Sequence, residues 1–365
     1  MEKCRHMLNA GLLGIFVLLF ALWAWCKPAD EQSLTERRKL ASLPEINGQS
    51  LLSGAFMTGF EKYAPDQFPL RESFRRLRAL WSRYGLGELD SHGVYLTENS
   101  AAKLDYPLQE ESVTYAAGRF TWLYETYMQE EDTRVYAAVI PDKSYFAAGD
   151  TWPAMDYEKL IDIFKAGTGF AQYIDLFPLL SLEDYYRTDA HWRQEALEPV
   201  AQALLETMGA QQTGTAYVQK TLEAPFYGVY YGQSALPMEP DTLRYLTNDT
   251  LAGLRVHDYE TEAEIPLYDE EKALGRDPYE MFLGGSKSLL TIENPCISGN
   301  RELILFRDSF GSSLAPLLAD GYARITLVDI RYISPALLSR YVDFHGKDVL
   351  FLYSTSVLNH SETIK

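Results

Sequence analysis

The sequence predicts an α/β domain built around a mostly parallel sheet and preceded by one transmembrane helix. Two observations lead to this fold class. A nearly uninterrupted apolar segment fills residues 7–26, and short apolar runs of strand length alternate with helical stretches farther along the chain. Such alternation favours a sheet that helices cover on both faces, which is a three-layer sandwich.

Composition narrows the classes of function. The chain has 365 residues, which allows one large domain or two modest ones. Its net charge of −18 argues against nucleic-acid binding, because bound phosphates need basic groups. Its 25 Tyr suit sugar-binding grooves, although ordinary packing accounts for most of them. No Cys/His cluster has zinc spacing and no glycine motif for nucleotides is present, so we expect no metal and no cofactor.

The apolar segment is a candidate membrane anchor. Between Met7 and Trp25 the one clearly polar residue is Asn9. About 19 helical residues span roughly 28 Å, close to the thickness of the hydrocarbon core of a bilayer. No small-x-small cleavage site follows, which favours an uncleaved anchor over a signal peptide. Basic residues stand on both sides of the segment, so charge alone does not decide which side of the membrane the domain faces.

Periodicity and composition divide the rest of the chain. Residues 1–6 form a short tail, residues 27–50 are a polar tether, and residues 51–365 form the domain, with an irregular insertion at about 211–300. Helical periodicity runs through residues 51–84, with a proline-bounded break at 65–71. The other predicted helices are 113–130, 155–165, 192–208 and 312–320, and the predicted strands are 135–140, 303–306, 325–329 and 349–353.

Ser309 is a candidate nucleophile because of its place in this pattern. It follows the strand 303–306, and functional sites in such sheets usually lie at the carboxyl ends of the strands. A hydroxyl at a strand-to-helix turn can be exposed beside backbone N–H groups, as an acyl-transfer nucleophile requires. The turn lacks the G-x-S-x-G pattern. The alternative is that Asp308 and Ser309 cap the following helix.

A serine nucleophile needs a base, and His191 is the best placed of the six histidines. Asp189 stands two residues before it, so its carboxylate can reach back and hold the imidazole in one tautomer. This spacing is easily met by chance. The alternatives are that Asp189 caps the helix 192–208, or that His257 is the base instead.

Two segments, TDAHW at 188–192 and RDSFG at 307–311, together resemble the DHHW family and its relatives, the AlgJ/AlgX-type alginate O-acetyltransferase proteins. The family name has a second histidine where this chain has Ala190. Further segments that resemble the family lie in the expected order: 36–44, 66–71, 93–96, 140–143 and 329–332.

The resemblance implies an SGNH-hydrolase-like (flavodoxin-like) domain outside the cytoplasm, held at the cell membrane by a single span. It implies Ser309 as nucleophile, His191 as base and Asp189 as the residue that orients the base. Its candidate substrate-binding residues are Trp192, Arg307 and Tyr353.

The implied activity is O-acetyl transfer to a cell-surface or secreted polysaccharide, with a multispanning membrane acyltransferase as partner. The alternatives are a carbohydrate esterase, a non-catalytic glycan-binding or scaffold protein, and an enzyme that faces the cytoplasm.

Overall fold

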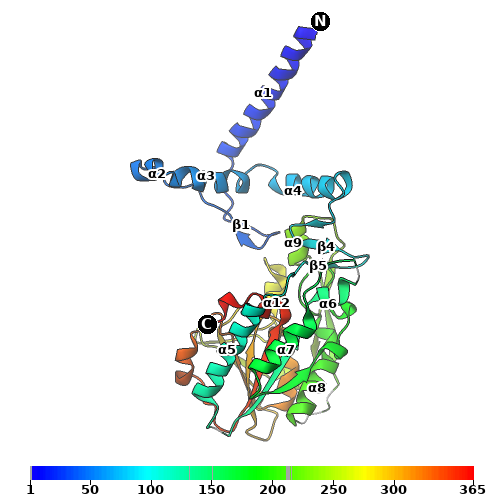
Figure 1. Cartoon of the computed structure of the whole chain (residues 1–365), viewed down its shortest axis with the longest axis vertical. Helices are drawn as coiled ribbons and strands as arrows, with labels where there is room; N and C mark the ends of the chain where they lie inside the picture. Colours follow the sequence, from blue (N-terminus) through cyan, green and yellow to red (C-terminus); the bar gives the residue numbers. More distant parts are fainter. Residues whose placement is uncertain (1, 131, 150, 211–213, 215) are drawn as a thin grey trace. The chain divides into compact units, whose positions relative to one another are not determined.

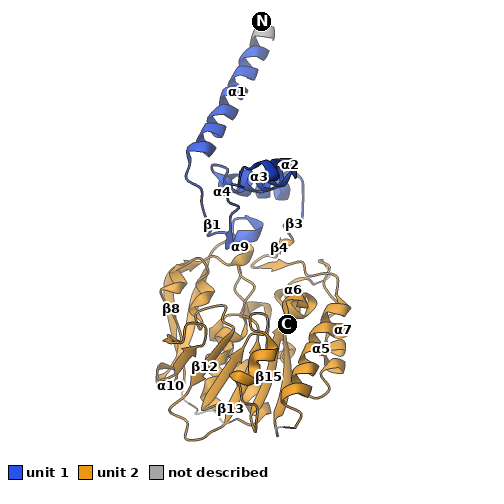
Figure 2. Ribbon diagram, turned by 90° about the vertical axis from the view of Figure 1, so that its left-hand side faces the viewer, with its two compact units in different colours: residues 1–92, 231–237 blue, residues 93–230, 238–365 orange. Residues whose placement is uncertain are grey.

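The computed structural model describes residues 2–130, 132–149, 151–210, 214 and 216–365. The chain forms two compact units, coloured separately in Figure 2. The first holds residues 1–92 with 231–237, and the second holds residues 93–230 with 238–365. The predicted start of the domain at residue 51 stays a prediction. Every candidate site residue lies in the second unit.

The first unit begins with the apolar helix α1 (Glu2–Cys26), blue in Figure 1. Its part from Arg5 to Cys26 is long and apolar enough to cross a membrane. The predicted break at 65–71 is confirmed, since one helix ends at Asp66 and the next begins at Arg71. The remaining elements of this unit are β1 (Gln32–Ser33), β2 (Arg38–Lys39), α2 (Gly48–Leu52), α3 (Ala55–Asp66), α4 (Arg71–Leu80), the π-helical turn η1 (Trp81–Gly85) and β3 (Asp90–Ser91).

The second unit is built on an eight-stranded sheet with the order β11-β10-β12-β14-β13-β15-β6-β7. The five strands from β14 to β7 run parallel, and β12, β10 and β11 extend the sheet with antiparallel pairings. The prediction of a mixed α/β fold with a mostly parallel sheet is confirmed. The strands are β6 (Arg134–Ile140), β7 (Gln172–Asp175), β10 (Arg255–Asp258), β11 (Ala263–Ile265), β12 (Leu289–Glu293), β13 (Glu302–Arg307), β14 (Arg324–Val328) and β15 (Asp348–Ser354).

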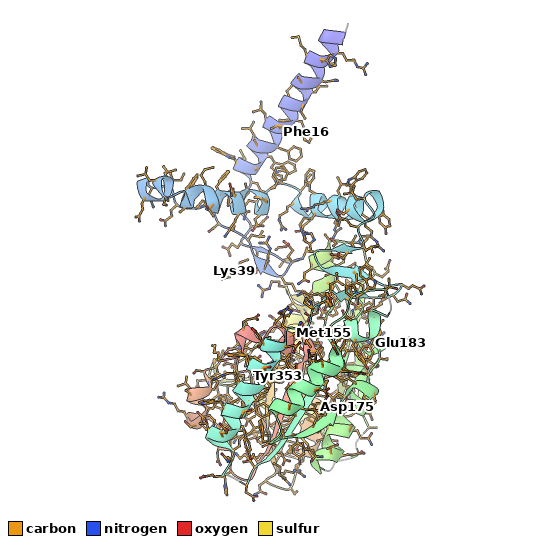
Figure 3. All side chains as sticks on the ribbon, viewed as in Figure 1. Phe16, Lys39, Met155, Asp175, Glu183 and Tyr353 are labelled. Carbon is orange, nitrogen blue, oxygen red and sulfur yellow. The ribbon has the colours of Figure 1, made fainter. Side chains whose placement is uncertain are left out.

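Side chains of β15 show how the sheet is covered. Leu350 and Leu352 pack on one face with residues of the helices α8 and α11. Phe351 and Tyr353 pack on the other face with residues of α5 and α7. Tyr353 lies in the interior of the unit, where Figure 3 labels it. The sheet therefore lies between two helical layers. The helices are α5 (Glu110–Tyr127), α7 (Tyr157–Gly167), α8 (Glu198–Met208) and α11 (Gly311–Leu318).

The stretch 211–300, expected to be irregular, contains strands. The pair β8 (Val218–Phe226) and β9 (Asp241–Thr247) is antiparallel, and β10 to β12 belong to the main sheet. The strands β8 and β10 were missed because they keep polar side chains exposed, which leaves no continuous apolar run. This reason does not apply to β12, which is buried at all but its last residue. The other short elements are β4 (Val94–Leu96), β5 (Ala101–Lys103), α6 (Lys143–Ala147), α9 (Val229–Ser234), α10 (Asp249–Ala252) and α12 (Thr355–Asn359).

Phe120→Ala should lower the free energy of unfolding by about 3–5 kcal/mol, because its loss leaves a cavity between α5 and the sheet. The Phe120 ring is fully buried, with its centroid 4.9 Å from that of Phe351 and 5.0 Å from that of Tyr353. Urea unfolding measures the change. The control Tyr115→Ala, at an exposed position of the same helix, should cost clearly less, and equal losses would contradict this packing.

Candidate active site

Ser309, His191 and Asp189 form a continuous chain of hydrogen bonds. Ser309 lies on the turn between β13 and α11, 118 residues from His191 in the sequence. The Ser309 Oγ and the His191 Nε2 are 2.8 Å apart, and the His191 Nδ1 lies 2.6 Å from the Asp189 Oδ1. With the carboxylate accepting, Nδ1 carries the proton and Nε2 can accept from the serine hydroxyl. The structure therefore brings the three residues together, and their catalytic roles stay a prediction.

The carboxylate of Asp189 is fully buried and its two oxygens have separate partners. Oδ1 also accepts the backbone N–H of His191 at 3.1 Å, while Oδ2 accepts the N–H of Val229 at 2.8 Å. The chain passes very close at Gly228, where a Cβ would lie 2.3 Å from the Cβ of Asp189. Only glycine allows this approach. The backbone at 228–229 therefore holds the carboxylate toward the imidazole.

A buried carboxylate, Asp241, holds the loop just before the site. It accepts the backbone N–H of Arg187 at 2.8 Å, and from Thr188 it accepts both the N–H at 2.7 Å and the hydroxyl at 2.6 Å. The same Thr188 hydroxyl accepts the N–H of Gly228 at 2.8 Å. These bonds satisfy groups that burial would otherwise leave without partners, and they fix the loop conformation.

A buried lysine, Lys143, holds the same loop through its carbonyl groups. It begins α6, and its Nζ donates to the carbonyl oxygens of Tyr186 at 2.7 Å, Arg187 at 3.1 Å and Asp189 at 3.1 Å. An ammonium has three N–H donors, so one charged group satisfies three acceptors of one loop. Burial lowers the pKa of Lys143 to about 7, against the opposing effect of the carboxylates of Asp241 and Asp189.

The imidazole of His191 stacks on Tyr279. The ring centroids are 3.8 Å apart and the planes differ by 9°. The Tyr279 hydroxyl lies 2.7 Å from the Ser313 Oγ, which also accepts from the indole Nε1 of Trp192 at 2.9 Å. Burial raises the pKa of Tyr279, so the phenol stays neutral. The stack and these hydrogen bonds hold the imidazole in one orientation.

The two capping alternatives are not observed. The helix α11 has no side-chain cap, and the Ser309 Oγ is directed to His191. Asp308 instead accepts the backbone N–H of Phe310 at 3.0 Å and that of Ser354 at 2.8 Å, which ties the turn to the neighbouring strand. The helix α8 begins at Glu198, well after His191, and has no side-chain cap either. His257 lies on β10 and its Nε2 is 3.7 Å from a carboxylate oxygen of Glu262, away from this chain of hydrogen bonds.

Trp192, Arg307 and Tyr353 were expected to bind substrate, but all three are buried. The Trp192 indole donates to Ser313 and to the Phe310 carbonyl, at 3.1 Å for the latter. The Arg307 guanidinium donates to the Asp308 carbonyl at 3.3 Å, and its burial lowers its pKa. Trp192 and Arg307 thus contact the turn that carries Ser309, whereas Tyr353 packs against Phe120 of α5, with ring centroids 5.0 Å apart. Contact of these three residues with substrate stays a prediction.

The sequence did not single out Lys143, Asp241 or Tyr279 as parts of the site. Lys143 lies in one of the segments that resemble the DHHW family, which is the one signal that pointed to it. Asp241 and Tyr279 lie in the stretch taken as irregular, and neither belongs to a recognisable motif.

No protein-family model and no curated protein matches the sequence. Solved structures do resemble the chain. A DHHW family protein from Eubacterium siraeum has a TM-score of 0.60 at 21% identity, over 75% of this chain and 95% of its own. The chain shares the fold of a DHHW family protein. PatB1 from Bacillus cereus, with a sulfonyl adduct, has a TM-score of 0.59 at 17% identity, over 73% of this chain and 95% of its own.

The O-acetyltransferase domain of Pseudomonas putida AlgJ is also similar, with a TM-score of 0.44 at 15% identity, over 73% of this chain and 92% of its own. The expected resemblance to the DHHW family is confirmed at the level of the fold.

Lys143→Met should flatten the dependence of stability on pH above pH 7. The pKa of Lys143 is about 7 in the folded chain, below the 10.5 of an unperturbed lysine. Between these values the unfolded state binds more protons, so the free energy of unfolding of the wild type gains up to about 1.4 kcal/mol per pH unit from this group. Urea unfolding of both proteins at pH 7.5 and pH 9 measures the difference in slope. Identical slopes would show that Lys143 does not titrate in this window.

Proposed function

We propose that the protein is a membrane-anchored, extracytoplasmic O-acetyltransferase that moves an acetyl group to a cell-surface or secreted polysaccharide. The hydrogen-bonded chain of Ser309, His191 and Asp189 carries the proposal, because a serine hydroxyl with an oriented base is what acyl transfer through a covalent intermediate requires. Ser309 and His191 are partly exposed, so a substrate can reach them, whereas Asp189 is buried.

The fold supports the proposal. The likeness to a DHHW family protein and to PatB1 favours an SGNH-hydrolase-like domain, in which a serine element and an Asp-x-His element meet at one edge of the sheet. PatB1 has been solved with a sulfonyl adduct. Sulfonyl reagents attach to activated hydroxyl nucleophiles, and Ser309 is the residue of this chain that we expect to react in that way.

In the first half-reaction Ser309 takes the acetyl group from a donor. Its Oγ attacks the acetyl carbonyl carbon while its proton passes to the His191 Nε2. The tetrahedral intermediate then collapses, the bond to the leaving group breaks, and His191 returns the proton to that group. The product is an acetyl ester on Ser309.

In the second half-reaction a sugar hydroxyl is the acceptor. It gives its proton to His191 and attacks the acetyl carbonyl, and the bond to the Ser309 Oγ breaks as that oxygen regains the proton. Asp189 remains hydrogen-bonded to Nδ1 throughout and stabilises the imidazolium that forms in each half. Water in place of the sugar would give acetate and the esterase reaction.

The anchor and the partner follow from the same proposal. The helix α1 would hold the protein at the membrane, with the catalytic unit outside the cytoplasm. A donor of acetyl groups on that side has to be supplied across the membrane, which is the task of a multispanning acyltransferase partner. The acceptor is the polysaccharide itself.

Ser309→Ala should abolish covalent labelling by a sulfonyl fluoride and lower acetyl transfer from an activated ester by about three orders of magnitude or more. Intact-mass and peptide analysis locate the label, and release of the alcohol measures turnover. The matched control is Ser312→Ala, a buried serine three residues farther on, which should keep both properties. Full transfer by Ser309→Ala would show that the hydrogen-bonded chain is not the catalytic site.

Incubation of the full-length protein with an acetyl donor and an acceptor glycan should yield O-acetylated glycan. Mass spectrometry of the glycan, together with a measurement of free acetate, separates transfer from hydrolysis. Acetate without modified glycan would establish the esterase, and a glycan that binds but is never modified would favour a binding protein.

Protease added outside intact cells should degrade the second unit, because the proposal places it outside the cytoplasm. Immunoblotting against the carboxyl terminus follows the loss, and the control is a cytoplasmic protein that survives. Survival of the whole chain would contradict the proposed side of the membrane.

A further inference from the structure

Large apolar side chains form an exposed stripe along α4 and the turn η1, in the first unit. Leu70, Phe74, Leu77, Trp81 and Tyr84 are all exposed, and Leu77 and Trp81 expose 62% and 65% of their surface. At about 100° per residue, Leu70 to Trp81 fall within a band about 60° wide. A helix of a soluble protein buries such a band against its core, so this one needs another explanation.

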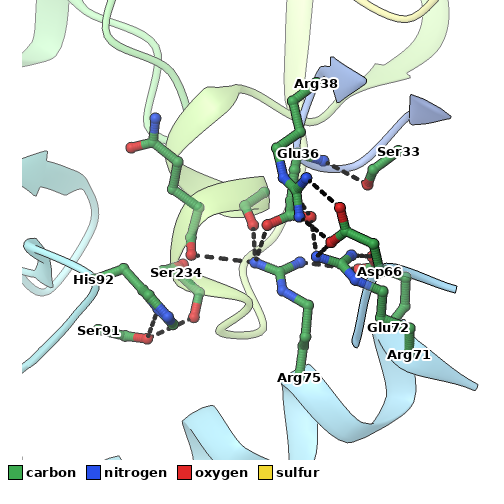
Figure 4. Close-up of polar contacts among 12 residues, drawn as sticks. Ser33, Glu36, Arg38, Asp66, Arg71, Glu72, Arg75, Ser91, His92 and Ser234 are labelled. Atoms are coloured by element: carbon green, nitrogen blue, oxygen red, sulfur yellow. Dashed lines mark hydrogen bonds and ion pairs between the residues drawn. The ribbon is translucent and has the colours of Figure 1, made fainter. Parts of the chain in front are cut away.

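The opposite face of α4 is fixed to the unit by ion pairs, shown in Figure 4. Arg71 pairs with Glu36, and also with Glu72 at 2.7 Å. Arg75 pairs with Glu72 at 3.0 Å and donates to the carbonyl oxygen of Gly232 at 2.8 Å. These contacts hold the polar side of the helix toward the rest of the unit, and Leu77 and Trp81 on the opposite side stay exposed.

The stripe continues into the surface of α1. The ring of Phe20 on α1 stacks on Phe68 with centroids 5.7 Å apart and lies 6.1 Å from Phe74, the second residue of the stripe. In Figures 1 and 2, α2, α3 and α4 lie in one layer, and α1 extends away from this layer. The apolar surface of the candidate membrane span therefore passes directly into the apolar stripe, where the bilayer surface would be.

The charge around the stripe suits an anionic lipid surface. Residues 71–83 contain five arginines and one acid, within a chain of net charge −18. In the part of the chain that the structure describes, Arg76, Arg78 and Arg83 form no ion pair, and Arg78 is exposed beside the stripe. Basic side chains that flank an apolar face are typical of helices that lie in the membrane interface.

We propose that residues 70–84 form an interfacial shelf, which lies on an anionic lipid bilayer with its apolar stripe inserted among the headgroups. The proposal rests on the membrane anchor of the proposed function and adds a second, lateral contact to it. With a span perpendicular to the bilayer and a helix lying along it, the first unit is held in one orientation at the membrane. A single span alone would leave it free to tilt and rotate.

The test places an environment-sensitive fluorophore on the full-length protein in vesicles of phosphatidylcholine and phosphatidylglycerol. Cys4, Cys26 and Cys296 are replaced by serine, and the label is attached in Leu77→Cys or, as the matched control on the same helix, Arg76→Cys. Lipids brominated on their acyl chains quench a fluorophore that enters the bilayer. We expect at least twofold greater quenching at position 77 than at position 76, together with an emission shifted to shorter wavelength.

Equal quenching at the two positions would overturn the shelf, provided that circular dichroism shows both variants folded. A blue-shifted emission at position 77 that brominated lipid does not quench would also overturn it, because a protein surface such as a second copy of the chain would then cover the stripe. Resistance of the same samples to alkaline carbonate reports on the anchor separately. A protein that is extracted by carbonate but still quenched at position 77 would keep the shelf and remove the anchor.

Discussion

Two buried charges of opposite sign hold the loop at residues 186–189, and the proposed chemistry depends on the conformation of this loop. The Lys143 ammonium takes the carbonyl oxygens of residues 186, 187 and 189, and the Asp241 carboxylate takes N–H groups of residues 187 and 188. Each charge is hydrogen-bonded to backbone groups of the loop, and the carboxylates of Asp241 and Asp189 also favour the charged form of Lys143. Burying a charge costs free energy, and here the hydrogen bonds to backbone groups of the loop offset that cost. The same hydrogen bonds fix the loop in the conformation in which His191 contacts Ser309.

The sheet brings the second partner to this loop. Ser309 follows β13, which lies between β14 and β15 in the parallel part of the sheet, and Asp308 is bonded to the backbone of Ser354 at the end of β15. The turn is therefore fixed by two neighbouring strands. The loop is held by Lys143, which begins α6 shortly after the end of β6. A site assembled from segments more than a hundred residues apart thus depends on one rigid edge of the sheet.

Much of this could be predicted from the sequence where the signal was local. The strands β6, β13, β14 and β15 are continuous apolar runs because both of their faces are buried, and the Asp-x-His spacing with Ser309 emerged from two short motifs. The roles of Tyr279 and Asp241 could not be predicted, because both act across the fold from a stretch without periodicity. The burial of Trp192, Arg307 and Tyr353 could not be predicted either, because the sequence alone does not show which side chains the core encloses.

Gly228 shows that a variant can lose the geometry of the proposed site while Ser309, His191 and Asp189 are all retained. Its backbone passes so close to Asp189 that any side chain would displace the carboxylate, while Ser309, His191 and Asp189 themselves would all remain in place in the sequence. A comparison of variants that checked only the three residues of the proposed site would class such a chain as intact. Gly228 should be checked as well, because the close approach that it allows is part of the geometry of the proposed site.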